Sequence, residues 1–292
     1  MCIALFMWQA HPLYPFLLLL NRDEYHNRPT TPVGWWECGQ ILGGKDEVAG
    51  GTWLACSRQG RVAFLTNVLE LHTLPEAKTR GHLPLRFLQS KKSPEAFAEE
   101  LVEEANQYNG FNLILADLCS KTMIYVSNRP KGEPILIQQV FPGIHVLSNS
   151  NLSSPWPKKP TIHSSKLISH LVFITSPQAR RLEQRFKSHI DLFRESEIPV
   201  ADIVKKLMND TMKADESKLP HICSLEWELN LSSIFVEIDT PLGKYGTRST
   251  AALTVKANGE ASFYEIFLER NIWKEHTFNY FIENFVIQSV ET

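Results

Sequence analysis

Residues 1–24 read MCIALFMWQAHPLYPFLLLLNRDE, and this stretch decides the fold class. Two short apolar runs, residues 2–8 and 13–20, are separated by Gln9-Ala10-His11-Pro12, which is typical of two strands joined by a turn. In such a hairpin the start of the first strand lies opposite the end of the second. The sequence therefore predicts that Cys2 lies beside Asn21-Arg22-Asp23.

The rest of the chain carries strand patterns, then a block of helix patterns, then strand patterns again. Further strands are predicted at residues 50–56, 61–67, 111–118, 123–126, 135–140, 144–147, 233–238, 248–256 and 261–268. Helices are predicted at residues 93–108, 164–193 with a break at Pro177, and 200–208. This order favours an α+β fold, a layered α/β/β/α arrangement of two stacked antiparallel sheets flanked by helices, over a doubly wound parallel sheet. Residues 1–292 show no repeat or linker and are expected to form a single domain.

Composition narrows the class of protein. The 292 residues carry 30 Lys plus Arg against 32 Asp plus Glu and show no long run of like charge, which argues against a nucleic-acid partner. Five scattered cysteines without a Cys-x-x-Cys pair predict a reducing, cytoplasmic setting and no metal site. The longest apolar run near the N-terminus, residues 16–20, is far shorter than the ~20 residues that cross a bilayer, so neither a signal peptide nor a transmembrane segment is expected.

Cys2 is the residue whose position points to chemistry. In an N-terminal-nucleophile (Ntn) hydrolase the first residue of the mature chain supplies both the attacking side chain and a free α-amine that acts as base. Cys2 meets this requirement once Met1 is removed. Arg22 beside it is expected to lower the thiol pKa by about one to three units, and Asp23 to orient the amine or hold Arg22. The alternative is that Arg22, Asp23 and Glu24 form surface ion pairs, which is the preferred reading for Glu24.

Three further polar positions could support acyl chemistry. Asn67 at a predicted strand end, and Asn149 or Asn151, could donate hydrogen bonds to an oxyanion. Asparagines at strand ends also serve as turn formers. Arg248 stands at a predicted strand start, where it binds an anion or pairs with a carboxylate.

Several short motifs together resemble the NRDE family, also called the transport and Golgi organization protein 2 family. These motifs, spread from residue 1 to about residue 270, are Met1-Cys2-Ile3, Asn21-Arg22-Asp23-Glu24, Gly50-Gly51-Thr52-Trp53-Leu54, Tyr108-Asn109-Gly110-Phe111-Asn112, Leu147-Ser148-Asn149, Pro155-Trp156-Pro157 and Gly246-Thr247-Arg248. The family is in turn similar to Ntn hydrolases of the choloylglycine hydrolase and penicillin V acylase type. The resemblance implies an Ntn-hydrolase-like four-layer αββα sandwich.

The same resemblance implies roles for individual residues. Cys2 is similar to the nucleophile, with Arg22 and Asp23 as its charged partners. Asn67 and Asn149 would be oxyanion or orienting residues, and Arg248 a second active-site arginine.

Two functions are compatible with these features. The first is a cysteine amidohydrolase or acyl transferase that acts on a small-molecule amide or thioester and requires no cofactor. The second is a non-enzymatic carrier of haem or acyl lipid, with haem as bound cargo on His26, His82 or Cys2. The resemblance implies roles in secretion, Golgi organisation, haem mobilisation and lipid metabolism, and so a cytoplasmic protein with possible association with Golgi or mitochondria. The oligomeric state is not implied.

Overall fold

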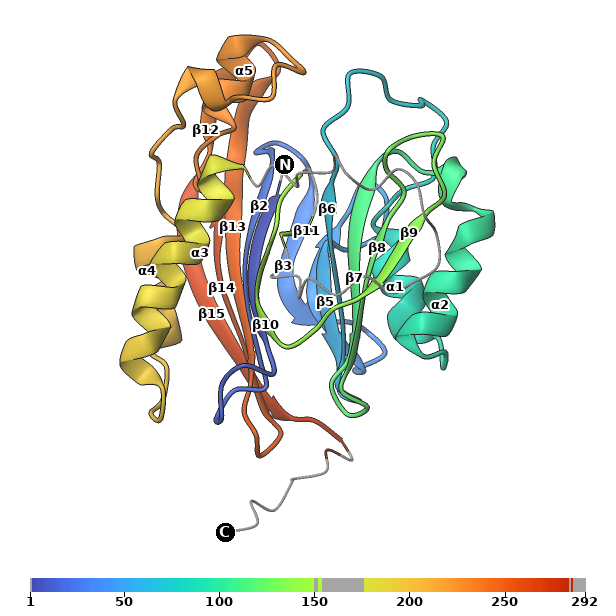
Figure 1. The fold of residues 1–292 in the computed structure, drawn as a ribbon, viewed down its shortest axis with the longest axis vertical. Coiled ribbons are helices and arrows are strands. Elements are labelled where there is room, and N and C mark those ends of the chain that lie inside the picture. Colours follow the sequence, from blue (N-terminus) through green and yellow to red (C-terminus); the bar gives the residue numbers. More distant parts are fainter. Residues whose placement is uncertain (1, 150–151, 154–175, 284, 286–292) are drawn as a thin grey trace, which may run out of the picture.

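The computed structural model describes residues 2–149, 152–153, 176–283 and 285, which form two stacked antiparallel β-sheets with helices on both outer faces (Figure 1). Sheet A has the order β11-β10-β1-β2-β13-β14-β15, and β12 pairs with β13. Its strands are β1 Cys2–Trp8, β2 Phe16–Tyr25, β10 Gly143–Leu147, β11 Leu152–Ser153, β12 Glu237–Thr240, β13 Gly243–Val255, β14 Glu260–Glu269 and β15 Ile272–Phe281.

Sheet B has the order β3-β4-β5-β6-β7-β8-β9 and is likewise antiparallel. Its strands are β3 Thr30–Trp35, β4 Ile41–Asp46, β5 Leu54–Ser57, β6 Arg61–Asn67, β7 Phe111–Asp117, β8 Thr122–Ser127 and β9 Leu136–Gln139. The helices of the described chain are α1 His82–Gln89, α2 Pro94–Glu100, α3 Pro177–Ile190, α4 Val200–Leu207 and α5 Leu225–Asn230, with 3-10 turns at Leu101–Glu103, Ala105–Gln107, Asp191–Phe193 and Glu216–Lys218.

Strand β1 shows why the N-terminal segment is apolar without interruption. Successive side chains of a strand point to opposite faces of the sheet. Those of Ala4, Phe6 and Trp8 enter the core between the two sheets, whereas those of Ile3, Leu5 and Met7 enter the core beneath α3 and α4. A strand covered on both faces reads as a continuous hydrophobic run.

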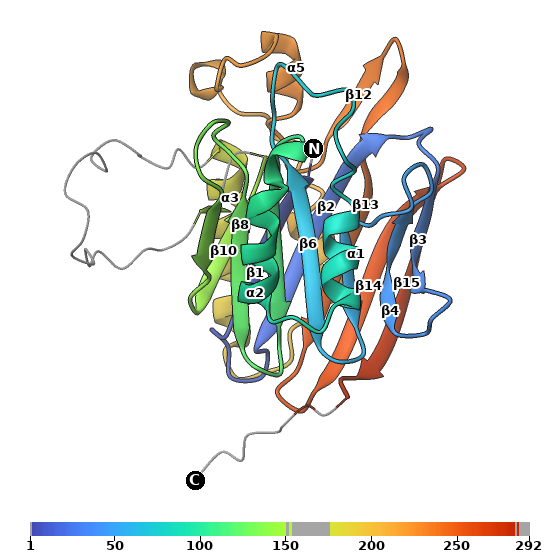
Figure 2. The same cartoon turned by 90° about the vertical axis from the view of Figure 1, so that its right-hand side faces the viewer.

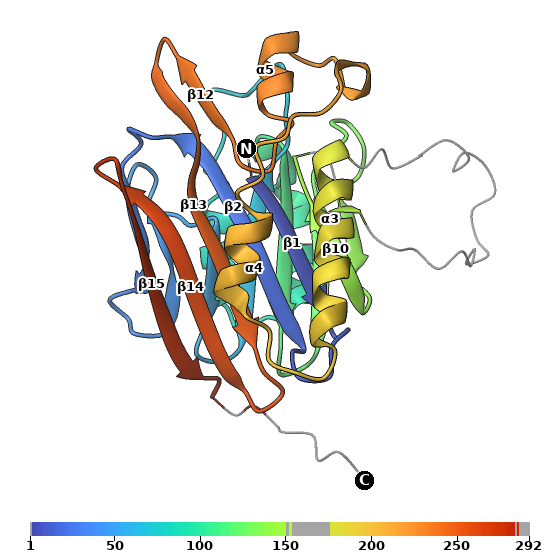
Figure 3. The same cartoon turned by 90° about the vertical axis from the view of Figure 1, so that its left-hand side faces the viewer.

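The helices complete the four layers. Figure 2 shows α1 and α2 lying across sheet B, and Figure 3 shows α3 and α4 across sheet A. In α3 the buried residues Ala179, Leu182, Phe186 and Ile190 recur at intervals of three and four, so one stripe of the helix faces the sheet. The predicted α+β, four-layer αββα arrangement is confirmed.

Several predicted elements are confirmed with changed bounds. The first hairpin forms with the predicted pairing, but its second strand is Phe16–Tyr25 rather than residues 13–20, so Arg22 and Asp23 lie inside the strand. Ser93 caps α2 by accepting a 3.2 Å hydrogen bond from the Ala96 N–H. That helix ends at Glu100 and continues only as 3-10 turns toward Tyr108. The predicted strand at residues 233–238 begins only at Glu237. Of the predicted helix at 164–193, residues 164–175 lie outside the described residues, as does the Pro155-Trp156-Pro157 motif.

The sequence patterns did not reveal β3, β4, β11, α1, α5 and β15. Strand β4 contains Gly43 and Gly44, residues that are depleted in strands. Strand β15 is largely exposed along its length, so apolar and polar residues do not alternate there as they do in a half-buried strand.

Candidate active site

Cys2 and Arg22 are directly opposite each other in the β1–β2 ladder. Even-numbered residues of both strands face the core between the sheets, so the two side chains lie on the same face, where cross-strand neighbours interact. Both side chains are buried, with 7% and 4% of their surfaces exposed. The predicted juxtaposition of Cys2 with the Asn21-Arg22-Asp23 segment is therefore confirmed.

Arg22 is held by residues of sheet B. Its Nη1 donates a 3.2 Å hydrogen bond to Thr30 Oγ1, and its Nη2 lies 3.6 Å from Asp46 Oδ2. Its guanidinium carbon lies 4.1 Å from the centre of the Trp53 ring, within the range of a cation–π contact. These contacts fix a positive charge beside Cys2.

Asp23 points to the opposite face of sheet A. Its Oδ1 accepts a 2.7 Å hydrogen bond from Thr247 Oγ1, and the side chain is 7% exposed. Burial raises the pKa of Asp23 to about 7, although the Thr247 hydrogen bond and the charge of Arg22 oppose this. Asp23 therefore titrates near neutral pH, close to the start of the chain.

Arg22 lowers the pKa of the Cys2 thiol as expected, but the net shift in the unprocessed chain is upward. Burial raises the pKa of the Cys2 thiol, and the charge of Asp23 acts in the same direction. A backbone hydrogen bond from Asp23 and the charge of Arg22 lower the thiol pKa, but burial outweighs them. Met1 lies outside the described residues, and its removal stays a prediction.

Arg248 lies in a β-bulge of β13. Thr247 pairs with Asp23 and Ser249 with Arg22, so Arg248 is the extra residue between them. Strand β13 begins at Gly243, and Arg248 is thus inside the strand rather than at its start. Bulges re-aim side chains beside functional sites.

The bulge directs Arg248 towards the segment that follows β2. Its Nη1 donates to the carbonyl oxygens of Tyr25 at 3.0 Å and Arg28 at 2.5 Å. Burial lowers the pKa of Arg248 to about 10, and the positive charge of Arg22 adds to the effect.

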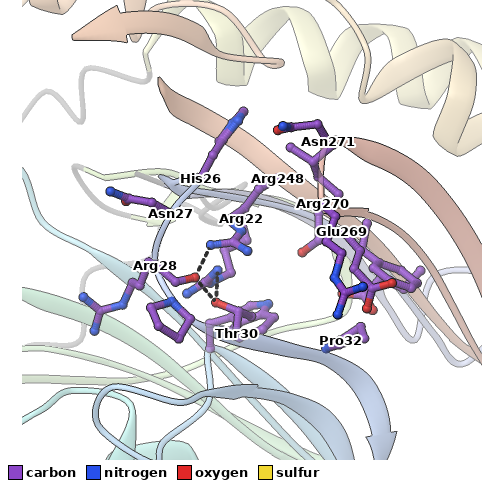
Figure 4. Close-up of a pocket in the computed structure, with 16 residues that line it drawn as sticks. Arg22, His26, Asn27, Arg28, Thr30, Pro32, Arg248, Glu269, Arg270 and Asn271 are labelled. Atoms are coloured by element: carbon purple, nitrogen blue, oxygen red, sulfur yellow. Dashed lines mark hydrogen bonds between the residues drawn. The ribbon is translucent and has the colours of Figure 1, made fainter. Parts of the chain in front are cut away.

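Arg22 and Arg248 line one pocket, which has a volume of about 270 Å³ (Figure 4). In Figure 4 they lie near its centre, with Asn27 and Arg28 on one side and the β14–β15 turn on the other. Cys2 is not among the residues that line this pocket. Arg22 thus connects the Cys2 position with the pocket.

Asn149 and Asn67 join the two sheets near Cys2. Asn149 Nδ2 donates a 2.6 Å hydrogen bond to the carbonyl oxygen of Asn67, and the Leu69 N–H donates to the Asn149 carbonyl at 3.2 Å. Ala4 pairs with Leu147, so continuing the β1–β10 register by two residues places Asn149 level with Cys2. Asn67 takes part through its backbone carbonyl, and Asn151 lies outside the described residues.

Glu24 forms a surface ion pair, as expected from the sequence. Its Oε2 lies 3.8 Å from Arg28 Nε in a partly exposed ion pair, and its Oε1 accepts a hydrogen bond from the Tyr25 N–H.

Several residues of the site were not predicted from the sequence, namely Thr30, Asp46, Trp53, Arg80 and Thr247. Arg80 Nη1 donates a 2.8 Å hydrogen bond to the Gly110 carbonyl oxygen. Burial lowers the pKa of Arg80, and the charge of Cys2 acts in the opposite direction. The signal for Trp53 and Arg80 was the Gly50-Gly51-Thr52-Trp53 motif. A Cβ on Gly51 would lie 2.4 Å from the Gly81 carbonyl carbon, so Gly51 allows the segment next to Arg80 to pack closely.

None of the helices among the described residues has the length and apolar character needed to cross a membrane. The two stacked sheets, their helical outer layers and a cysteine at the start of β1 define a protein with the Ntn hydrolase fold. A solved structure of the C2A mutant of conjugated bile acid hydrolase from Clostridium perfringens aligns over 100% of both chains with a TM-score of 0.50 and 12% identity.

The chain belongs to the Transport and Golgi organisation 2 family, whose sequence model matches residues 1–270. It is 29% identical to the Transport and Golgi organization 2 homolog of Mus musculus, over 97% of this chain and 100% of the relative. It is 30% identical to the Transport and Golgi organization protein 2 homolog of Bos taurus, over 91% of this chain and 92% of the relative. The predicted family is confirmed.

Proposed function

We propose that this protein is a cytoplasmic cysteine Ntn amidohydrolase or acyl transferase that acts on a small-molecule amide or thioester after Met1 is removed. The observation that carries the proposal is the pairing of Cys2 with Arg22 on the buried face of sheet A. A cysteine and an arginine buried side by side form a costly arrangement that the packing of the sheets alone does not require.

The reaction would begin with attack of the Cys2 sulfur on the substrate carbonyl carbon. The thiol proton passes to the α-amine of Cys2 and from there to the leaving nitrogen or sulfur, as the bond between that atom and the acyl carbon breaks. Water then hydrolyses the acyl-cysteine and regenerates the thiol, whereas an amine or alcohol in place of water gives acyl transfer. No cofactor is required.

Charged and polar neighbours would support each stage. Arg22 favours the thiolate, and the free amine created by Met1 removal would lie near Asp23, whose proton exchanges near neutral pH. Asn149 uses one N–H of its amide on the Asn67 carbonyl, and its second N–H is the candidate donor to the oxyanion. The fold of a bile acid hydrolase agrees with such chemistry without defining a substrate.

The test combines intact mass with acyl-enzyme detection. Protein is prepared with Cys2 as its first residue and incubated with acyl anilides and acyl thioesters. A burst of product, together with an acyl mass increment on Cys2, supports the proposal. Cys2→Ala should abolish both signals, and Cys38→Ala, at an exposed cysteine, should change neither. Equal turnover in the Cys2→Ala protein, or no turnover of any substrate by the parent, would overturn it.

A carrier is the second candidate, because the 270 Å³ pocket is lined by residues that do not include Cys2. His26 is the better haem ligand of the two histidines, since its Nε2 is buried and without a partner in the described chain, whereas His82 Nε2 lies 2.8 Å from the Ala49 carbonyl oxygen. The pocket is smaller than the roughly 300–1,000 Å³ of drug-sized ligand sites, so haem would bind with much of its ring outside.

Haem titration separates the carrier from the enzyme. Stoichiometric haemin binding that is lost in His26→Ala and kept in Cys2→Ala would favour the carrier. Binding that is equal in the parent and in His26→Ala would exclude His26 as the haem ligand.

A further inference from the structure

The pocket that Arg22 and Arg248 share contains buried polar atoms that the described chain leaves without hydrogen-bond partners. We call it the arginine pocket and define it by six of its lining residues, Arg22, His26, Arg28, Arg248, Ser249 and Glu265. Among the described residues, His26 Nε2, Ser249 Oγ and Glu265 Oε1 are buried and have no partner. Most buried polar atoms in proteins are satisfied, so three unsatisfied atoms in one pocket point to a ligand.

Two of these residues are themselves almost wholly buried. Ser249 is 5% exposed and Glu265 is 1% exposed. Glu265 is fixed through its other oxygen, since Oε2 accepts a 2.7 Å hydrogen bond from the Val33 N–H and lies 3.1 Å from His276 Nε2. Glu265 Oε1 is therefore a positioned acceptor, and its missing partner is a donor.

The three arginines of the arginine pocket differ in their ion pairs: Arg22 and Arg28 have carboxylate partners, Arg28 with Glu24 as well as Asp46, whereas Arg248 has none among the described residues. Asp46 is shared between Arg28, at 2.7 Å, and Arg22, at 3.6 Å. Arg248 is 9% exposed, and in the described chain it hydrogen-bonds through Nη1 to two carbonyl oxygens and forms no ion pair. A guanidinium offers further donors in a planar fork that suits an oxyanion.

We propose that the arginine pocket binds a small ligand that carries an oxyanion, a carboxylate or a phosphate, and next to it a hydroxyl or amide N–H. The oxyanion of the ligand faces Arg248 and Arg22 and accepts a hydrogen bond from the Ser249 hydroxyl. The donor of the ligand reaches Glu265 Oε1, and His26 Nε2 provides a further polar contact. Burial lowers the pKa of His26, which leaves the neutral ring able to donate or accept.

The size and position of the pocket set the scale of the ligand. A volume of about 270 Å³ suits a compact molecule rather than a chain or a large ring system. The β14–β15 turn residues Arg270 and Asn271, which are among the lining residues in Figure 4, have the left-handed backbone angles φ of 49° and 64°. Recognition of this ligand does not depend on Cys2 chemistry, so the inference stands apart from the proposed function.

The experiment measures binding to full-length Cys2→Ala protein, which cannot consume a ligand through Cys2. Four probes are titrated by calorimetry at constant ionic strength: glycerate, propanoate, glycerol 3-phosphate and inorganic phosphate. At least one hydroxylated probe should bind roughly tenfold or more tightly than its partner without a carbon-bound hydroxyl. The better of the two hydroxylated probes identifies the oxyanion as carboxylate or phosphate.

Variants locate the binding. Arg248→Met should weaken the best probe by about 10- to 100-fold, Arg248→Lys by less, and Ser249→Ala by several-fold. Arg86→Met is the matched control, because Arg86 pairs with Glu104 beneath sheet B, outside the arginine pocket. Ser249→Ala keeps the test meaningful if Arg248→Met does not fold.

Two results would overturn the proposal. One is the absence of binding by all four probes at 10-fold molar excess and millimolar concentration. The other is an equal loss of binding in Arg86→Met and Arg248→Met, which would indicate attraction by overall charge. Binding without turnover by the parent protein would leave this proposal intact while removing the enzymatic one.

Discussion

The guanidinium of Arg22 lies 4.1 Å from the centre of the Trp53 ring, so the cation beside Cys2 contacts the residue that directly precedes β5 of the opposite sheet. Trp53 fits there because Gly44 has no side chain, since a Cβ at Gly44 would lie 2.3 Å from the ring. The Asn-Arg-Asp and Gly-Gly-Thr-Trp motifs, distant in sequence, are thus two halves of one contact.

The Trp53–Arg22 contact predicts unequal effects of two substitutions. Trp53→Phe and Trp53→Leu both remove buried volume, but only Phe keeps an aromatic face for the cation. We expect Trp53→Leu to lower the free energy of unfolding by about 3 kcal/mol and Trp53→Phe by about 1 kcal/mol less than that. Urea denaturation measures both. Equal losses would show that the cation–π contact contributes nothing to stability.

Gly51 gives a second prediction about this contact region. A Cβ there would lie 2.4 Å from the Gly81 carbonyl carbon, and backbone cannot move aside easily. Gly51→Ala should therefore destabilise the protein by about 1–3 kcal/mol and reduce acyl transfer by displacing the neighbouring Arg80. The control is Gly34→Ala, whose Cβ would meet only Pro32 O at 3.9 Å. A thermal melt in which both variants match the parent would refute the argument.

Local pattern was enough to predict the Cys2–Arg22 pair, because a short turn and two buried strands permit only one register. It could not show that Trp53 contacts Arg22 or that Asn149 reaches Asn67, since both contacts depend on how the two sheets stack. The β-bulge at Arg248 cannot be predicted from the alternation of apolar and polar residues. The sign of the Cys2 pKa shift was mispredicted because a neighbouring charge is visible in a sequence, whereas depth of burial is not.

Asp23 should make stability depend on pH in a defined window. Burial raises its pKa to about 7, above the value of ~3.9 for an unfolded aspartate, so the folded state holds the proton more tightly. This contribution to stability is complete below about pH 4 and is lost as the pH rises to about 7. Relative to Asp23→Asn, the free energy of unfolding of the parent should fall by a few kcal/mol as the pH rises across that window.

The measurement for Asp23 is urea denaturation at pH 4, 5.5, 7 and 8. Asp239→Asn, which changes an exposed side chain, is the control and should track the parent at every pH. A constant difference between the parent and Asp23→Asn over this range would mean that Asp23 does not titrate there.

Asn149 should affect chemistry more than stability. Its hydrogen bond to the Asn67 carbonyl is partly buried, so Asn149→Ala should cost about 1 kcal/mol of stability. Loss of an oxyanion donor should lower the acyl-transfer rate by about 100-fold. The control Thr66→Val removes the 2.8 Å hydrogen bond to the Ser148 carbonyl at the same junction. If the acyl-transfer rate of Thr66→Val falls as far as that of Asn149→Ala, Asn149 acts only by joining the two sheets.

Removal of Met1 should reverse the order of thiol reactivity. In the unprocessed chain Cys2 is buried and its pKa is raised, so iodoacetamide should label it more slowly than the exposed Cys38. Once Cys2 is the first residue, its own α-amine adjoins the thiol. Cys2 should then become the fastest-labelling cysteine near neutral pH, with a rate gain of up to about tenfold for each unit by which its pKa falls towards the working pH. Cys56 is an internal reference for burial, because burial raises its pKa to about 12 and it lies far from the N-terminus in sequence.

Mass-spectrometric mapping of both forms, prepared from a cleavable N-terminal extension, gives the labelling rates. The Arg22→Leu variant of the processed form should label Cys2 more slowly below pH 8, because a lost positive charge raises a thiol pKa. If processing leaves the Cys2 rate unchanged, the free amine does not activate the thiol, and the Ntn mechanism fails while the fold and the arginine pocket remain.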